Sequence, residues 1–258
     1  MSNEKLKKYG YKEVKVKSKH ELARFEGDAK IIFYKTGKIL VQGKKEFALQ
    51  AKQLVNYLGL EENKNVMGQA VGTDESLKGD TFGGIVVAGF KADDKIRQQL
   101  KAMGVKDSKM LLKPDIVKLA EELIQKFPDS YHVESLTPKE YNKMNHLMNV
   151  TQILDKLHEK CYKKLSRSVI HIVDLYPGCG VGNIREAKAE SKYLDVAAAS
   201  IIARFEALKQ IRALEQKAGF FIPMGSTHVE SALLEIKKKS LNPSDYVKMK
   251  FKNVSAFF

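Results

Sequence analysis

The sequence predicts a mixed α/β protein in which a small α+β domain precedes a larger domain built on a mixed sheet. Strand-like and helix-like runs follow one another without a strict βαβ repeat, which favours a mixed sheet flanked by helices. A polar run, "EENKN" at 61–65, separates two different patterns. The 258 residues, 43% of them hydrophobic, are enough for two unequal cores. We therefore expect domains at 1–63 and 64–258.

In the first domain, three strand-like runs precede one helix. The runs 29–35 and 38–43 flank Thr36-Gly37, a hairpin turn signal, and run 11–17 alternates as a strand does. Residues 44–60 carry apolar side chains at helical spacing. A sheet with one helix and a lysine-rich surface would suit nucleic-acid binding.

The second domain combines four expected strands with four expected helices. The strands cover 66–74, 83–90, 130–136 and 168–176. The helices cover 114–127, 137–165, 197–219 and 229–240. Apolar residues dominate run 168–176, which is typical of a buried central strand.

The net charge is strongly positive, with 45 Lys and Arg residues against 31 Asp and Glu residues, or +14. Residues 1–63 alone carry 14 basic against 8 acidic side chains. This imbalance favours a polyanionic partner, with nucleic acid first and an acidic membrane second. Solubility alone is the competing explanation.

Nothing in the sequence indicates a membrane or secreted protein. No apolar run approaches the ~18 residues of a membrane span, and the basic N-terminus lacks the apolar core of a secretory signal. We expect a cytoplasmic monomer without a membrane partner. Cys161 and Cys179 form no CxxC pair, so free thiols are favoured over a disulfide or a zinc site.

Four acids lie where strands end or where a helix packs. Asp74 and Asp174 end expected apolar strands, where a carboxylate is costly unless a cation meets it. Glu75 follows Asp74, and Glu190 precedes the small residues 197–200, which allow close packing on a sheet. Such an all-oxygen set would select Mg²⁺ or Mn²⁺, and carboxylates around two ions cleave phosphodiesters. For each acid alone, a helix cap or a surface charge is the competing explanation.

Five segments, in order, resemble the motifs of the type 2 ribonucleases H. They are "GTDESLKGDTFG", "GVKDSKML", "HIVD", "KAESKYLDVAAASIIAR" and "IPMGST", and they span roughly residues 70–230. Within that family the chain looks most like the HIII subgroup, whose N-terminal domain resembles the TATA-binding protein and assists substrate binding. The resemblance implies a ribonuclease H-like fold and an endonuclease that cuts the RNA strand of RNA/DNA hybrids, leaving 5′-phosphate and 3′-hydroxyl ends.

The resemblance also implies the metal-site and catalytic residues. Asp74, Glu75 and Asp174 take the places of the first three carboxylates, and Glu190 takes the fourth, where many members have aspartate. Two Mg²⁺ or Mn²⁺ ions are the implied cofactors. Asp195 lies nearby, but its place in the motif is not acidic, so we expect it on the surface.

The residues after the paired acids resemble the family's ribose-sensing loop, which usually reads Gly-x-Gly. Here Ser76 precedes Leu77-Lys78-Gly79; Lys78 suits a phosphate, and Leu77 departs from the pattern. A leucine at positive φ costs about 1–2 kcal/mol, and its side chain could crowd the ribose and weaken cleavage. The alternative is that Leu77 packs harmlessly against the N-terminal domain.

Four further residues are candidate substrate contacts. Ser108 and Lys109 could hold a phosphate at a helix N-terminus, or Ser108 could simply cap that helix. Asn142 matches an Asn in the family's corresponding helix and could face the substrate. Ser200 could contact the nucleic-acid backbone, but packing against the sheet is the favoured interpretation.

Two other functions stay open at this point. The chain could be a binding protein for RNA/DNA hybrids with an impaired catalytic site, for which Leu77 is the best argument. It could also be a metal-dependent DNase on the same fold that lost ribose selection together with the glycine. The four acids argue against the first of these, because a binding protein needs no such set.

Overall fold

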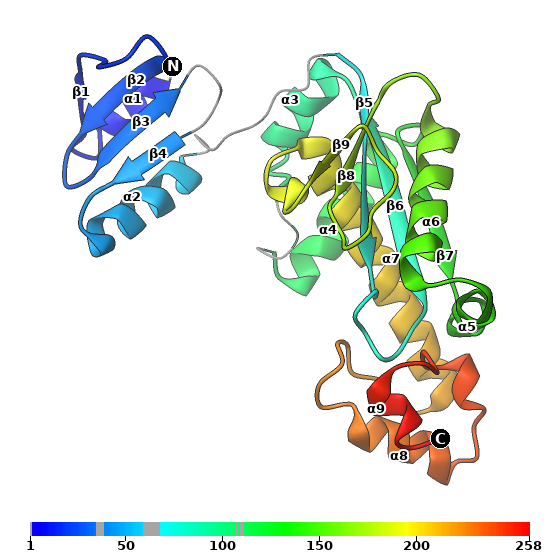
Figure 1. Cartoon of the computed structure of the whole chain (residues 1–258). Coiled ribbons are helices and arrows are strands. Elements are labelled where there is room, and N and C mark those ends of the chain that lie inside the picture. Colours follow the sequence, from blue (N-terminus) through cyan, green and yellow to red (C-terminus); the bar gives the residue numbers. More distant parts are fainter. Residues whose placement is uncertain (1, 35–38, 59–67, 107, 109–110) are drawn as a thin grey trace. The chain divides into compact units, whose positions relative to one another are not determined.

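The computed structural model describes residues 2–34, 39–58, 68–106, 108 and 111–258. The chain forms two compact units, Met1–Asn65 and Val66–Phe258 (Figure 1). The expected turn at Thr36-Gly37 and the polar run at 61–65 lie outside the described residues.

The N-terminal unit is an antiparallel four-stranded sheet in the order β1-β2-β3-β4, accompanied by two helices. The strands are β1 (Lys12–Val14), β2 (Glu21–Glu26), β3 (Lys30–Tyr34) and β4 (Ile39–Gln42), and the helices are α1 (Ser2–Lys7) and α2 (Lys45–Tyr57). Leu6, Phe25, Ile31 and Ala51 belong to one buried cluster that joins helices and sheet. The sequence did not predict β2 or α1. β2 escaped because its sequence, "ELARFE", contains charged residues that suggest an exposed segment. In the fold Glu21 and Arg24 are both buried and form an ion pair, 2.6 Å apart.

The larger unit is built on a five-stranded sheet in the order β7-β6-β5-β8-β9. Its strands are β5 (Ala70–Ser76), β6 (Ile85–Ala92), β7 (Tyr131–Leu136), β8 (Ile170–Asp174) and β9 (Ile184–Glu186). β5, β6 and β7 pair antiparallel, whereas β8 runs parallel to both β5 and β9. The expected mixed sheet is therefore confirmed.

Helices cover both faces of this sheet. They are α3 (Asp94–Ala102), α4 (Lys113–Lys126), α5 (Pro138–Leu147), α6 (Val150–Leu165) and α7 (Leu194–Ala218). The run at 137–165, expected to be mostly helical, forms two helices: α5 ends at Leu147, and Asn149 caps α6 by accepting a hydrogen bond from the amide of Gln152. α3 was also not predicted.

The alternation of side chains along β5 and β8 sends neighbouring residues to opposite faces. Ala88, which pairs with Asp74, packs in the large cluster on the α7 side. Val87, which pairs with Glu75, packs in the smaller cluster with α6. Figure 1 shows α6 and α7 along different faces of the sheet. Adjacent acids on β5 therefore meet different surroundings.

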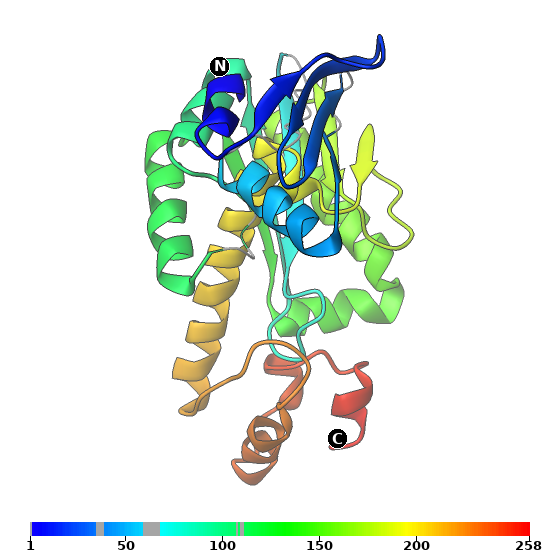
Figure 2. The same cartoon turned by 90° about the vertical axis from the view of Figure 1, so that its left-hand side faces the viewer.

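The last part of the chain gathers at the far end of α7, next to the segment that links β5 to β6 (Figures 1 and 2). It comprises α8 (Glu230–Lys238), the 3-10 helix η3 (Pro243–Asp245) and α9 (Lys252–Ser255). Phe82 in the β5–β6 segment forms an isolated antiparallel bridge with Val247. None of the described helices has both the length and the apolar character to cross a membrane.

Candidate metal and active site

Asp74 and Asp174 lie on the same face of the sheet, at the ends of neighbouring parallel strands. The register pairs Thr73 with Val173, so Asp74 and Asp174 occupy the next position on their two strands. Asp74 is 7% exposed. This is the edge where an open α/β sheet places functional side chains, at the carboxyl ends of parallel strands.

Glu190 reaches the same face through the 3-10 helix η2 (Ala189–Ser191), which directly precedes α7. The amide of Ala189 donates to Asp174 Oδ1 over 2.8 Å, and Glu190 itself is buried. Gly72 explains why α7 can begin here: a Cβ on Gly72 would lie 2.3 Å from the backbone nitrogen of Val196. Only glycine on β5 lets the first turn of α7 come this close.

The electrostatics of Asp74 are unfavourable for a carboxylate. Burial raises the pKa of Asp74 well above its ordinary value, and the charges of Glu75 and Asp174 raise it further. Contacts with the Ser200 hydroxyl and the Glu75 amide, which donates over 2.8 Å, oppose this shift only in part. An added cation at this place would relieve the repulsion.

Glu75 points to the other face, toward α6, and has cationic or polar partners there. Lys78 Nζ lies 2.5 Å from Glu75 Oε1, and His158 Nε2 lies 3.4 Å from Glu75 Oε2, too poorly aligned for a hydrogen bond. Burial acts to raise the pKa of Glu75, but His158 and Lys78 outweigh it and hold this pKa below its ordinary value. Glu75 is therefore stabilised as a carboxylate by the protein itself.

His158 is a buried residue beside Glu75 that sequence reasoning missed. It is fully buried, and its Nδ1 lies 2.7 Å from the hydroxyl of Thr73, which lies 2.9 Å from Nε2 of His171. Burial and the charge of His158 lower the pKa of His171 to about 3, so His171 is neutral near pH 7. The signal was available: His158 shares the apolar spacing of Leu154 and Cys161 on one helix face.

The donor set fits a hard divalent cation by its chemistry, because it consists of carboxylate oxygens around a buried Asp74 of raised pKa. The described side chains do not form a complete metal-coordination site in this structure. Within the described residues, no three His, Cys, Asp or Glu side chains are gathered so that they could hold a metal ion as they stand. The opposite orientation of Glu75 is one reason for this. The expected convergence of all four acids stays a prediction.

The expected ribose-sensing loop is a tight turn. The carbonyl of Leu77 accepts a hydrogen bond from the amide of Asp80 over 3.1 Å, with Lys78 and Gly79 at the two central positions. Leu77 has φ of 67°, the left-handed region that the family's glycine would favour. Its side chain is 2% exposed and belongs to the core cluster on the α7 side. A side chain so buried does not project toward a ligand, so its position does not support crowding of a ribose.

Gly79 contrasts with Leu77 in the same turn. A Cβ on Gly79 would meet nothing within 4 Å, and Gly79 does not have a positive φ. The described fold therefore does not require glycine at this position, and the backbone at Gly79 is open on the side where a Cβ would lie. Lys78 lies 5.4 Å from the ring centroid of Tyr176 as well as against Glu75.

Of the four other candidates, three have described positions. The hydroxyls of Ser108 and Ser200 lie 2.9 Å apart and both are buried, with Ser200 also against Asp74. Ser108 does not cap α4, because that helix begins at Lys113 after Leu112. Lys109 lies outside the described residues.

Asn142 has a structural task that the sequence did not indicate. Its amide nitrogen donates to the carbonyls of Ser244 and Val247 over 3.2 and 2.8 Å, and its oxygen accepts from the amide of Met249 over 2.9 Å. The side chain therefore ties α5 to the C-terminal segment. A contact with substrate stays a prediction without support from this arrangement.

The expectation that Asp195 lies on the surface was wrong. Asp195 is 1% exposed and forms a two-pronged ion pair with Arg97, with both nitrogen–oxygen distances at 2.9 Å. Arg97 also donates to the carbonyl of Gly68 over 2.7 Å, just ahead of β5. The pair connects α3, α7 and the start of β5, and a charged pair of this kind is invisible to a reading based on motif positions alone.

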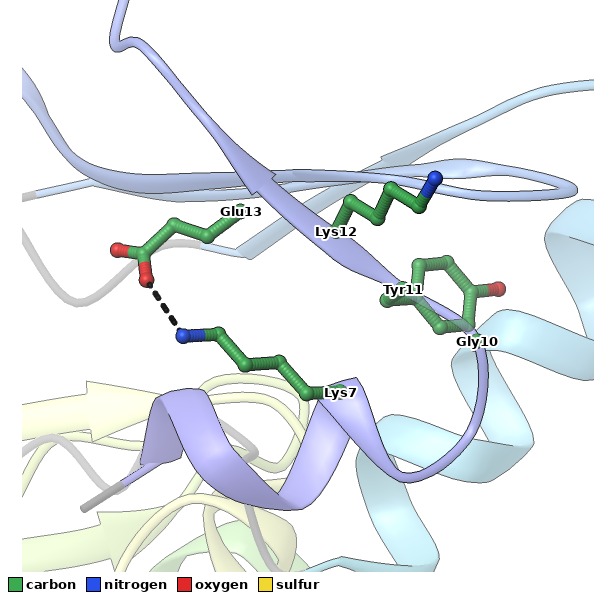
Figure 3. Close-up of a pocket in the computed structure, with 5 residues that line it drawn as sticks. All are labelled: Lys7, Gly10, Tyr11, Lys12 and Glu13. Carbon is green, nitrogen blue, oxygen red and sulfur yellow. Dashed lines mark ion pairs between the residues drawn. The ribbon is translucent and has the colours of Figure 1, made fainter.

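A shallow pocket of about 320 Å³ lies on the N-terminal unit, lined by Lys7, Gly10, Tyr11, Lys12 and Glu13. Figure 3 shows Lys7 directed toward Glu13, whose carboxylate lies 3.7 Å away, while Lys12 points elsewhere. Glu13 therefore offsets the charge of one of the two lysines that line this pocket.

Comparisons with known proteins agree with this geometry. Residues 71–254 match the family described as Ribonuclease HII. The chain is 34% identical over 245 residues to a ribonuclease HIII of Bacillus pumilus, covering 81% of this chain and 78% of that protein. It is 31% identical to a ribonuclease HIII of Aquifex aeolicus, covering 92% and 90%.

Solved structures give the same result for the fold. The crystal structure of Bst-RNase HIII in complex with Mn²⁺ matches with a TM-score of 0.70 and 25% identity, over 98% of this chain and 93% of that one. The crystal structure of Aquifex aeolicus ribonuclease H3 matches with a TM-score of 0.58 and 28% identity, over 97% of both chains. The chain therefore belongs to the ribonuclease HII family of endoribonucleases and is similar over most of its length to ribonucleases HIII.

Proposed function

We propose that this protein hydrolyses the RNA strand of RNA/DNA hybrids with the help of two divalent cations, Mg²⁺ or Mn²⁺, leaving 5′-phosphate and 3′-hydroxyl ends. The observation that carries the proposal is the position of Asp74. Its carboxylate is buried at the end of β5, beside Asp174 and Glu75, with a raised pKa. Family membership and the Mn²⁺ complex of a structural relative support the same conclusion.

Asp74, Asp174, Glu190 and Glu75 are the residues that would hold the ions. Bound there, divalent cations would activate a water molecule and stabilise the leaving oxygen of the phosphodiester. Asp74 and Asp174 contribute two carboxylates from one sheet face, and η2 supplies Glu190 through its contact with Asp174. Glu75 is kept ionised by Lys78 and His158, but it faces α6, so its side chain would have to turn toward Asp74 to bind the same ions.

Selection of the RNA strand is assigned to the turn after these acids, Ser76 to Gly79. Peptide groups at the exposed part of the turn would contact ribose 2′-hydroxyls, and the open space at Gly79 supports this role. The effect of Leu77 belongs to the proposal as well. Burial of its side chain within the larger unit supports a packing role, so we propose that Leu77 has little effect on the cleavage rate.

The N-terminal unit is proposed to assist hybrid binding, with the domain boundary near residue 64 and a monomeric protein. Its excess of basic side chains, 14 against 8 acidic over residues 1–63, supports electrostatic attraction to the phosphate backbone. The share of a ribonuclease HIII structure that matches, 93%, supports a comparable two-domain organisation.

The test is a cleavage assay with the full chain. A labelled RNA/DNA hybrid and a plain DNA duplex of the same sequence are incubated with protein in Mg²⁺, Mn²⁺ or chelator, and the product ends are mapped. We expect cleavage of the hybrid alone, only with a divalent ion, and 5′-phosphate ends.

Each other outcome contradicts the proposal in a different way. Binding without cleavage in either metal would favour a hybrid-binding protein with an impaired site. Cleavage of the plain duplex would favour a DNase without ribose selection. Cleavage that persists in chelator would exclude the metal mechanism.

A further inference from the structure

A lysine from the C-terminal segment lies inside the protein beneath the ribose-sensing turn. Lys248 is fully buried, and its Nζ donates to the carbonyl of Leu77 over 2.7 Å and to the carbonyl of Asp80 over 2.6 Å. These carbonyls belong to the first and last residues of the turn. Tyr141 and Phe251 place their rings 5.5 and 5.3 Å from the same ammonium.

The burial of this ammonium calls for a physical reason. An ammonium out of contact with water is costly, and Lys is rarely fully buried unless it is paired. Burial lowers the pKa of Lys248 to about 7, against the opposing charge of Asp80. The described contacts that compensate for this burial are two carbonyls of one turn and the faces of two aromatic rings. The hydrogen bonds described for this ammonium therefore both go to the turn.

The backbone around Lys248 fixes the same segment. The Lys248 amide donates to the Thr81 carbonyl over 3.0 Å, and the Gly83 amide donates to the Tyr246 carbonyl over 3.0 Å. The neighbouring loop adds a second attachment, because the Gly225 amide donates to Asp80 Oδ1 over 2.6 Å. The turn is therefore held by residues more than 140 positions away in the sequence.

Peptide geometry connects this attachment to ligand binding. In a trans peptide the carbonyl of one residue and the N–H of the next point in opposite directions. Because the Leu77 carbonyl points at the buried Lys248 Nζ, the N–H of Lys78 is directed away from it. An ammonium that fixes the carbonyl thus fixes the direction of a backbone donor next to the open position at Gly79.

We propose that Lys248 is a positioning residue for substrate selection: through the carbonyls of Leu77 and Asp80 it holds the ribose-sensing turn in its binding conformation. The identity of the substrate in this inference rests on the proposed function. The stabilisation of the turn by Lys248 does not depend on it. Among the described residues, the contacts of the Lys248 ammonium are two carbonyls and two aromatic rings, and none of them is a carboxylate of the metal site.

The test compares Lys248→Met with Lys250→Met in the full chain. Methionine keeps most of the apolar stem of lysine and removes its N–H donors. Lys250 is an exposed lysine of the same segment whose Nζ donates to the Asn145 carbonyl instead. Two measurements are made: amide hydrogen exchange of peptides that cover residues 76–84, and steady-state cleavage of an RNA/DNA hybrid at saturating Mn²⁺.

For Lys248→Met we expect faster exchange in 76–84 and a KM for the hybrid raised about ten-fold, with kcat changed less than about two-fold. Lys250→Met should match the wild type in both measurements. A merely structural role would lower the thermal midpoint and the active fraction without raising KM. Unchanged exchange together with an unchanged KM would overturn the inference.

A second variant covers the case in which Lys248→Met does not fold. The amide nitrogen of Lys248→Gln ends one bond nearer the backbone than the lysine nitrogen, so it cannot reach both carbonyls as lysine does. We therefore expect a KM between those of the wild type and Lys248→Met, and a KM equal to that of the wild type with unchanged exchange contradicts the inference. If the wild type does not cleave hybrids, the proposed function fails, while the exchange measurement still decides whether Lys248 holds the turn.

Discussion

The end of β5 and the turn that follows it are only a few residues apart, yet the fold treats them in opposite ways. At the strand end, buried Asp74 meets the like charges of Glu75 and Asp174, and its pKa is raised. In the turn, the carbonyls of Leu77 and Asp80 are both satisfied by Lys248, and the Leu77 side chain is buried. The first region has negative charges that the protein does not fully balance, whereas the polar groups named in the second region have hydrogen-bond partners.

This difference indicates two ways of preparing a binding site. A cluster of like charges is completed by its ligand, so it costs stability until a cation binds. A turn that must present its backbone to a substrate is fixed in advance by the protein, which lowers the ordering cost of binding. Glu75 shows the contrast within one residue step, because Lys78 and His158 already lower its pKa. Substitutions in the two regions should therefore have opposite signatures.

The largest effect is expected for Asp74→Asn. Cleavage of the hybrid should fall by at least about 100-fold, because under the proposed function a carboxylate that holds the metal ions is lost. Binding of the hybrid in chelator should be retained. In the absence of metal the thermal midpoint should rise, because the neutral amide removes repulsion from Glu75 and Asp174. The measurements are single-turnover cleavage, a binding titration and thermal unfolding.

Glu75→Gln is the matched comparison for the stability part. It removes a carboxylate that Lys78 and His158 stabilise, so the midpoint without metal should fall. The control is Glu159→Gln. Glu159 forms an exposed ion pair with Lys163 on α6, so this substitution should change neither the activity nor the thermal midpoint. If Asp74→Asn and Glu75→Gln shift the midpoint in the same direction, the contrast between these two acids is wrong.

Leu77→Gly should lower the free energy of unfolding by about 1–3 kcal/mol. Loss of the buried side chain is the larger contribution, and relief of the positive φ offsets about 1–2 kcal/mol. The cleavage rate per folded molecule should not rise, because the side chain lies in the core rather than toward the ligand. Denaturant unfolding and rates at low temperature check both parts. A faster variant would restore the idea that Leu77 weakens the enzyme.

Gly79→Ala should separate binding from folding in the same turn. The free energy of unfolding should stay the same or rise by up to about 1 kcal/mol, because a methyl group meets nothing within 4 Å and φ is not positive. Hybrid cleavage should fall about ten-fold if the backbone must approach the ribose closely. Steady-state kinetics beside thermal unfolding decide this. Normal kinetics would remove Gly79 from the substrate-binding residues.

A further expected effect is a dependence of stability on pH that arises from Lys248. Its folded pKa of about 7 lies below the ordinary value, so the folded state binds fewer protons than the unfolded state above pH 7. Wild-type stability relative to Lys248→Met should rise between pH 7 and about 10, by at most about 1.4 kcal/mol per pH unit, and stay level below pH 7. Asp80 is the charged group at the ammonium and Tyr141 the ionisable ring beside it. A difference independent of pH from 6 to 9 contradicts the lowered pKa.

Much of this architecture could be predicted from apolar patterns in the sequence. The runs that became β5, β6 and β8 alternate or are continuously apolar, and their ends identified Asp74 and Asp174 as candidates. Short strands with charged residues escaped: β2 contains the buried pair of Glu21 and Arg24. The interruption between α5 and α6 also escaped, because the capping residue Asn149 resembles an ordinary polar helix residue.

The parts of the site that could not be predicted depend on contacts between distant segments. Neither Lys248 under the turn nor the pairing of Asp195 with Arg97 leaves a local pattern in the sequence. His158 did leave one, as a polar residue on an apolar helix face. The opposite orientation of Asp74 and Glu75 follows from the alternation of side chains along a strand. Which acid faces α6 and which faces α7, however, can be decided only once the pairing of β5 is known.

The central claim is that the strand end around Asp74 is completed by a divalent cation. Its most direct test is calorimetric titration of metal-free protein with Mn²⁺ in the absence of nucleic acid, for the wild type and for Asp74→Asn. We expect Mn²⁺ to bind the wild type and to bind Asp74→Asn at least about ten-fold more weakly. Equal affinity of both proteins for Mn²⁺, or no binding to the wild type, would contradict the account.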